Sequence, residues 1–130
     1  MILIPAAKSG HFTVSTGVTT IAESTFTDCK KLTSVTIPEG VTEIPRNAFY
    51  RCIGLKKVTL PDSLTTIGSY AFAYCSSLEV VHIRDNVTSV HTMAFYKCTG
   101  LKGIEVGKNN RNYYSEDGIL FNKSRTEIQK

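Results

Sequence analysis

The chain repeats itself every 23 residues, and this periodicity constrains its fold more than any other feature. The phenylalanine column comprises Phe26, Phe49, Phe72 and Phe95, and the cysteine column comprises Cys29, Cys52, Cys75 and Cys98. Five more apolar columns keep the same step, beginning at Val18, Ile21, Leu32, Val35 and Ile37. A single short unit cannot enclose its own apolar groups, whereas stacked units can. The seven columns therefore predict a solenoid.

The unit at residues 32–52 indicates what each turn of this solenoid contains. Apolar and polar residues alternate over residues 35–37, which is typical of a strand. Pro38 and Gly40 then end the strand, and Pro45 opens a short helical turn, where its missing N–H loses no hydrogen bond. We therefore predict an α/β repeat solenoid with a parallel sheet on its concave face and short helical turns on its convex face.

The two ends depart from the repeat, as the caps of a solenoid do. Phe12 occupies a strand column of a degenerate first unit, and residues 2–4 are expected to cover the first open edge. Residues 113–121 predict two strands around an Asp-Gly turn, and residues 127–130 predict a third. We expect one domain over residues 1–130, divided into an N-terminal cap (1–17), repeats (18–106) and a C-terminal β meander cap (107–130).

Composition excludes several other classes of protein. Hydrophobic residues make up 42% and charged residues 20% of the 130 residues, which favours a folded domain over disorder. A net charge of +4 is far from the concentrated basic stripe of a nucleic-acid-binding protein. No apolar run approaches the roughly 20 residues of a membrane span. Residues 1–5 are apolar but too short for a signal peptide, so we expect no export signal in the chain as given.

The shared column of the four cysteines limits their chemistry. Equivalent residues of successive units lie about 5 Å apart, so four of them extend over roughly 15 Å. A tetrahedral zinc ion needs every sulfur about 2.3 Å from one point, which a column cannot supply. We predict buried thiols beside the phenylalanines, and a disulfide between neighbouring cysteines stays an alternative.

The three histidines do not form a catalytic arrangement with other residues. His11, His82 and His91 occupy different columns, and no nucleophile accompanies them at a recognisable spacing. A group of asparagines and acids lacks the spacing of a calcium loop, so turn formation is the better interpretation of these residues, which are Asn109, Asn110, Asn112, Glu116 and Asp117. The sequence therefore predicts no enzyme activity, no catalytic residue, no metal and no cofactor.

The repeat motif LxxVxIPxxVxxIxxxAFxxC, best matched by residues 32–52 and 55–75, resembles the BspA-like, or treponemal-type, leucine-rich repeats. The segment 112–123 also resembles the sequence that often follows such repeats. Departures include Arg84 and Gly107, which replace the proline that ends the strand. The resemblance implies a cell-surface or secreted protein of bacteria or anaerobic protists. It further implies a protein partner, including host matrix or cell-surface protein, adhesion, and no enzyme activity.

The outward positions of the predicted strands are the main candidates for binding, because a solenoid holds them as a rigid array. Their charges are mixed, which argues against nucleic acid as partner. A structural spacer and a cytoplasmic scaffold remain alternative functions, and the convex tyrosines Tyr50, Tyr70, Tyr74 and Tyr96 form a second candidate surface. The predicted concave binding residues are Lys56, Lys57, Thr59, Glu79, Val80, His82, Lys102 and Glu105.

Overall fold

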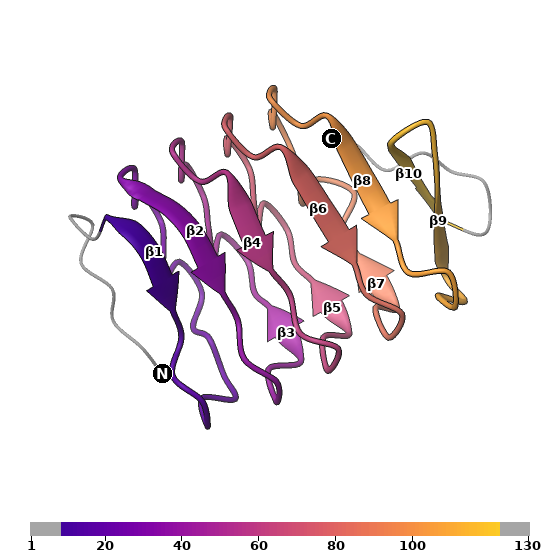
Figure 1. Cartoon of the computed structure of the whole chain (residues 1–130), viewed down its shortest axis with the longest axis horizontal. Coiled ribbons are helices and arrows are strands. Elements are labelled where there is room, and N and C mark those ends of the chain that lie inside the picture. Colours follow the sequence, from indigo (N-terminus) through magenta and orange to yellow (C-terminus); the bar gives the residue numbers. More distant parts are fainter. Residues whose placement is uncertain (1–8, 123–130) are drawn as a thin grey trace.

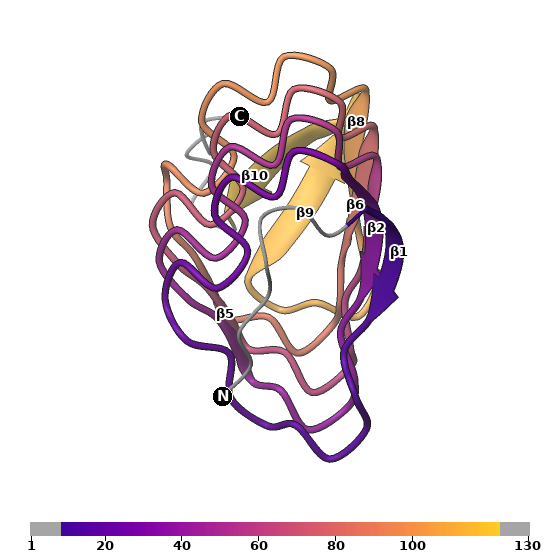
Figure 2. The ribbon, with the colours of Figure 1, turned by 90° about the vertical axis from the view of Figure 1, so that its left-hand side faces the viewer.

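The protein is a β-solenoid whose strands lie in two layers, and its three interior coils contribute one strand to each layer (Figure 1). The structure is a computed structural model that describes residues 9–122. The front layer of Figure 1 contains β1 (Gly10–Thr13), β2 (Leu32–Thr36), β4 (Lys57–Thr59), β6 (Val80–Ile83) and β8 (Gly103–Val106). The rear layer contains β3 (Glu43–Ile44), β5 (Thr66–Ile67) and β7 (Ser89–Val90). Figure 2 shows the chain winding between the two layers.

The strand register confirms the period of 23 residues. In the front layer Val35 pairs with Val58, and in the rear layer Ile44 pairs with Ile67, all in parallel. The rear sheet is an addition to the expected fold, since the sequence predicted only one strand per repeat unit. Residues that are 23 positions apart in the sequence therefore pair with each other in the strands of both layers.

The front layer is divided rather than continuous. Strands β1, β2 and β4 form one sheet, and β6 and β8 form another. A hydrogen bond from Glu79 N to Lys56 O, at 3.2 Å, joins the chain just before β6 to the chain just before β4. The two strands nevertheless lack ladder pairing in the part of the chain that the structure describes. We call this boundary the β4–β6 seam.

The phenylalanine column forms the centre of the core. Its rings stack nearly parallel, with centroid distances of 4.7 Å between Phe26 and Phe49, 5.1 Å between Phe49 and Phe72, and 5.4 Å between Phe72 and Phe95. All four side chains are fully buried. Each ring therefore packs on the neighbouring coils, which is why stability belongs to the interfaces between repeats.

The helical turns expected on the convex side are not confirmed, because residues 9–122 contain no helix. Asn47 (φ 58°) and Arg51 (φ 62°) have left-handed backbones, which interrupt a right-handed helix. The amide of Phe49 donates to Ala71 O of the next coil, at 2.7 Å, instead of bonding along a helix. Ala48 N and Tyr50 N bond instead to carbonyls three residues earlier, so bonds along the chain alternate with bonds to the next coil and the segment is a series of turns.

The four cysteines are buried thiols, as predicted, and none is in a disulfide. Three of them also donate hydrogen bonds to a phenylalanine carbonyl of the preceding coil. Cys52 Sγ lies 2.9 Å from Phe26 O, and Cys75 Sγ lies 3.1 Å from Phe49 O. The third bond joins Cys98 Sγ to Phe72 O at 2.9 Å. These three thiols therefore link neighbouring coils by hydrogen bonds.

Burial should make these thiols unreactive in the folded protein. Desolvation raises the pKa of both Cys52 and Cys98 from 9.0 to about 12. At pH 8.5 we therefore expect iodoacetamide to modify the cysteines only after unfolding, since the thiolate is the reactive form. Because the folded pKa is raised, the thiols contribute stability below pH 9.0 that is lost as the pH rises toward about 12. Mass spectrometry after iodoacetamide labelling with and without urea measures the reactivity of the thiols. Fast labelling of the cysteines without urea would contradict the prediction.

The hairpin expected after the repeats is confirmed. β9 (Tyr113–Glu116) and β10 (Ile119–Asn122) pair antiparallel around Asp117 (φ 54°) and Gly118 (φ 78°), a left-handed pair typical of two-residue hairpin turns. Gly118 O accepts a hydrogen bond from Ile104 N of β8, at 2.9 Å. The expected third strand at 127–130 and the cover at 2–4 lie outside the described residues. The division at residues 17 and 106 stays a prediction.

Asn110 occupies the turn between β8 and this hairpin, and it is 4% exposed. Its Nδ2 donates to Arg84 O (2.8 Å) and Val87 O (3.1 Å). Its Oδ1 accepts from the backbone amides of Asn112 and Tyr113, both at 2.8 Å. These bonds confirm that the asparagine-rich segment is built for turns, and they satisfy backbone groups at the end of the last coil.

Candidate functional site

The predicted binding residues all lie on the front layer or just before its strands. Seven of them are exposed and Val80 is half-buried, whereas the residues between them, such as Val58 and Val81, are buried. The strand pairing places Lys57 beside Ser34, and His82 beside Glu105. Alternation along each strand therefore sends these side chains outward from the core.

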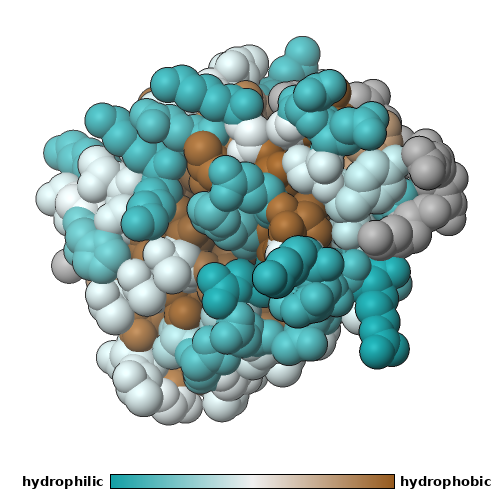
Figure 3. All heavy atoms as spheres, turned by 45° about the vertical axis from the view of Figure 1, so that its right-hand side comes forward, coloured by the Kyte–Doolittle hydropathy of each residue, from teal (hydrophilic) through white to brown (hydrophobic). Residues whose placement is uncertain are grey.

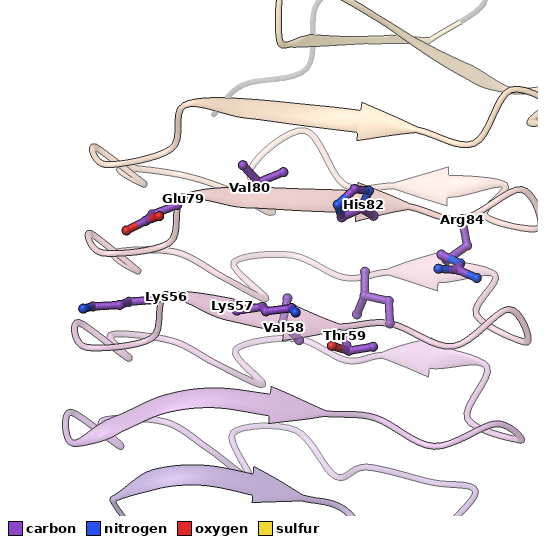
Figure 4. Close-up of a pocket in the computed structure, with 9 residues that line it drawn as sticks. Lys56, Lys57, Val58, Thr59, Glu79, Val80, His82 and Arg84 are labelled. Carbon is purple, nitrogen blue, oxygen red and sulfur yellow. The ribbon is translucent and has the colours of Figure 1, made fainter.

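Six of the eight residues line one groove, of about 450 Å³, at the β4–β6 seam. Figure 4 shows the groove-lining side chains, with Lys56 just before β4, Lys57 on β4 and His82 on β6. Val58, Val80 and Leu60 give the groove an apolar component, and hydrophobic residues are visible between hydrophilic ones on the face shown in Figure 3. The candidates lining the groove are Lys56, Lys57, Thr59, Glu79, Val80 and His82.

The other two predicted residues lie beyond this groove. Glu105 lines a smaller adjoining hollow of about 280 Å³ together with His82, and Lys102 lines neither. His82 Nδ1 and Glu105 Oε1 are 3.1 Å apart, and both side chains are more than half exposed. His82 therefore belongs to both hollows and connects them.

Arg84 is a groove residue that the sequence reasoning did not select. It lines both hollows and its Nε donates to Asp62 Oδ1 at 2.8 Å. The signal was present in the sequence, because Arg84 stands where other units have a strand-ending proline. An arginine there extends the cationic side of the groove, although Asp62 balances part of its charge.

The groove combines cations, one carboxylate and apolar side chains. Lys56, Lys57 and Arg84 outnumber Glu79, so the groove has a net positive charge. These side chains come from the strands that border the seam, β4 and β6, and from the residues next to them. Such a surface can bind a partner by charge and apolar contact together.

No group of three or more histidine, cysteine, aspartate or glutamate side chains within residues 9–122 is arranged to hold a metal ion. In the same part of the chain, no helix is long and apolar enough to cross a membrane.

The other two histidines lie apart from the groove. His11 lies on the front layer, where its Nε2 is 2.9 Å from Thr13 Oγ1. The Nδ1 of His91 accepts a hydrogen bond from Met93 N at 3.1 Å, within a turn.

The predicted convex tyrosines meet on the turns between the two layers. We call Tyr50, Tyr70, Tyr74 and Tyr96 the tyrosine patch. Their rings contact one another edge to face, for example Tyr50 with Tyr74 at a centroid distance of 5.5 Å. Desolvation and the neighbouring tyrosines raise the pKa of Tyr74. The patch shares no residue with the grooves of the front layer.

The repeat, the two-layer coil and the buried columns together define a leucine-rich-repeat solenoid. The family model described as the BspA type leucine rich repeat region matches residues 7–125 in six copies. The chain therefore belongs to the BspA-type leucine-rich repeat family, and the match includes the degenerate first unit and the hairpin. Among curated proteins, no similar sequence was found.

Solved structures of bacterial proteins have the same fold. A leucine rich cell surface protein from Faecalibacterium prausnitzii A2-165 is 39% identical, with a TM-score of 0.69 over 77% of this chain and 26% of its own. A leucine-rich repeat protein from Bacteroides ovatus ATCC 8483 is 26% identical, with a TM-score of 0.69 over 83% of this chain and 31% of its own. A T. pallidum leucine rich repeat protein is 26% identical, with a TM-score of 0.52 over 67% and 51%. This chain thus spans about a quarter to a half of each protein.

Proposed function

We propose that this protein is a non-catalytic interaction module of a bacterial cell-surface protein and that it binds a partner protein through its front layer. The observation that carries this proposal is the groove at the β4–β6 seam, where six outward residues from two coils surround one hollow. A protein partner is favoured because the groove offers both charged and apolar contacts on a rigid backbone. The surface location is supported by the bacterial relative described as a leucine rich cell surface protein.

Adhesion is the form of interaction that we propose, with host matrix or a cell-surface protein as partner. Repeat proteins hold an extended array of side chains, which suits recognition of another macromolecule better than chemistry on a small one. The net positive charge of the groove should speed encounter with an acidic surface, and it should make binding weaken as salt rises.

A charge-reversal experiment tests the groove. The double variant Lys56→Glu/Lys57→Glu should weaken binding to any matrix or cell-surface partner by about tenfold or more, because it turns the cationic side negative. The matched control Lys30→Glu/Lys31→Glu makes the same change in charge at two exposed lysines outside the groove. Its affinity should stay within about twofold of the parent protein.

Partners would be captured from matrix and cell extracts, identified by mass spectrometry, and titrated one by one by biolayer interferometry. Equal loss in both double variants would mean that net charge alone drives binding, which contradicts a specific groove. If both double variants bind with the affinity of the parent protein, the binding site lies outside the groove. A chain with no partner in any extract would favour the structural spacer, and a partner found only among cytoplasmic proteins would favour the scaffold.

A further inference from the structure

The tyrosine patch is an aromatic cluster assembled from three successive coils. Tyr70 lies 6.0 Å from Tyr96, and Tyr74 lies 5.7 Å from Tyr96, with interplanar angles of 88° in both pairs. Tyr50 contacts Tyr70 and Tyr74 in the same edge-to-face manner. Tyr74 is 39% exposed and Ile53 beside it is 44% exposed, so the cluster presents apolar area to solvent.

Two of these tyrosines have a backbone conformation that tyrosine rarely adopts. Tyr70 has φ of 55° and Tyr74 has φ of 62°, in the left-handed region. A bulky residue is disfavoured there, whereas asparagine and aspartate tolerate it. The left-handed positions equivalent to these two in other coils hold polar or charged residues, of which asparagine and aspartate suit this backbone best. These residues are Ser24, Asp28, Asn47, Arg51 and Lys97. Folding alone therefore does not explain why tyrosine occupies both positions.

Two hollows adjoin the patch, and both are lined by Tyr50 and Tyr74. The first has a volume of about 600 Å³ and also includes Ile53 and Lys97. The second has a volume of about 430 Å³ and includes Arg46, Tyr70 and Tyr96. The residues that line each hollow come from three successive coils, so both hollows extend along the solenoid axis.

The charge around these hollows has one sign. Arg46, Arg51 and Lys97 line them, and no acidic side chain does. Asp28 lies 3.3 Å from Arg51 Nε and balances part of that charge. Lys97 Nζ lies 5.6 Å from the centroid of the Tyr96 ring, which keeps a cation beside the aromatic surface. The complementary ligand is therefore acidic and has apolar groups as well.

We propose that the tyrosine patch is a second binding surface, independent of the front-layer groove, and that it takes an extended acidic segment of a partner protein. Aromatic-lined grooves suit extended, proline-containing peptides, because these lose little entropy on binding. A sugar ring would need an open aromatic face to stack on, and here the rings cover one another edge to face. Tyrosine and arginine are also the residues enriched in protein interfaces.

Intrinsic fluorescence of the whole chain provides a direct test. The sequence has six tyrosines and no tryptophan, so the four tyrosines of the patch contribute most of the emitting residues. The probe is a tyrosine-free peptide of about twelve alternating glutamate and proline residues, long enough to cross three coils. We expect a saturable change in tyrosine emission and a matching heat of binding by calorimetry. A lysine–proline peptide of the same length should give neither.

The decisive variant is Tyr70→Asn/Tyr74→Asn. It should keep or raise the melting temperature, because asparagine suits the left-handed backbone, and it should weaken peptide binding by about tenfold or more. If this variant unfolds, Arg46→Glu/Lys97→Glu gives the same test without altering the tyrosines. The front-layer variant Lys56→Glu/Lys57→Glu should bind the acidic peptide as the parent does.

Three outcomes would overturn the proposal. The first is that neither peptide binds. The second is that a heparin oligosaccharide binds in a tyrosine-dependent way while the acidic peptide does not, which would make the ligand a sulfated glycan. The third is that only the front-layer variant loses the peptide, which would move the site to the groove. Because each surface has its own variants, failure of the tyrosine-patch proposal can be distinguished from failure of the front-layer proposal.

Discussion

Replacing Phe72 with alanine should destabilise the protein by about 3–5 kcal/mol, which is typical of a fully buried aromatic side chain. Phe72 is 0% exposed and its ring stacks between Phe49 and Phe95, at centroid distances of 5.1 Å and 5.4 Å with interplanar angles of 4° and 5°. Loss of the ring removes packing on two coils at once, and the buried neighbours cannot close the cavity without moving their own coils.

The effect is measured by urea denaturation followed by circular dichroism, with parent and variant at the same protein concentration. Lys56→Ala is the control, since this exposed side chain should change the free energy of unfolding by less than about 0.5 kcal/mol. A shift for Phe72→Ala no larger than the shift for Lys56→Ala would show that the phenylalanine column is not the core.

Replacing Asn110 with alanine should cost about 2–4 kcal/mol, because buried backbone groups are then left without partners. The asparagine side chain makes four hydrogen bonds with backbone groups, two as donor and two as acceptor. Two of these groups, Arg84 O and Val87 O, belong to the last complete coil, and the other two begin the hairpin. The variant should therefore loosen the C-terminal cap before the interior coils.

Asn109→Ala is a matched control, because it makes the same chemical change one residue away at an exposed position. Hydrogen exchange monitored by mass spectrometry distinguishes the two variants by region. Faster exchange over β8, β9 and β10 in Asn110→Ala, with the interior coils unchanged, would agree with a cap. Equal stability of the two asparagine variants would contradict the role assigned to the four hydrogen bonds.

Much of the candidate site was predictable because a period of 23 residues fixes which residues are equivalent. Once Val35 and Val58 share a column, the residues between the columns must point outward, and Lys57 and His82 follow directly. Burial of the cysteines was predictable for the same reason. Arg84 was missed because it occupies a column that usually holds proline, where no outward side chain was expected.

The sequence by itself determined the repeat, the strand register, the composition of the core and the outward faces, since these depend only on which residues recur at one spacing. The tertiary structure decided the rest. It divided the front layer at the β4–β6 seam, left the expected helical turns as turns without a helix in residues 9–122, and gave Tyr70 and Tyr74 left-handed backbones. It also brought the thiols of Cys52, Cys75 and Cys98 to carbonyls of neighbouring coils. These features depend on which backbone groups of one coil form hydrogen bonds with the next coil. The period of the sequence shows which residues are equivalent, but it does not specify the geometry of the contacts between them.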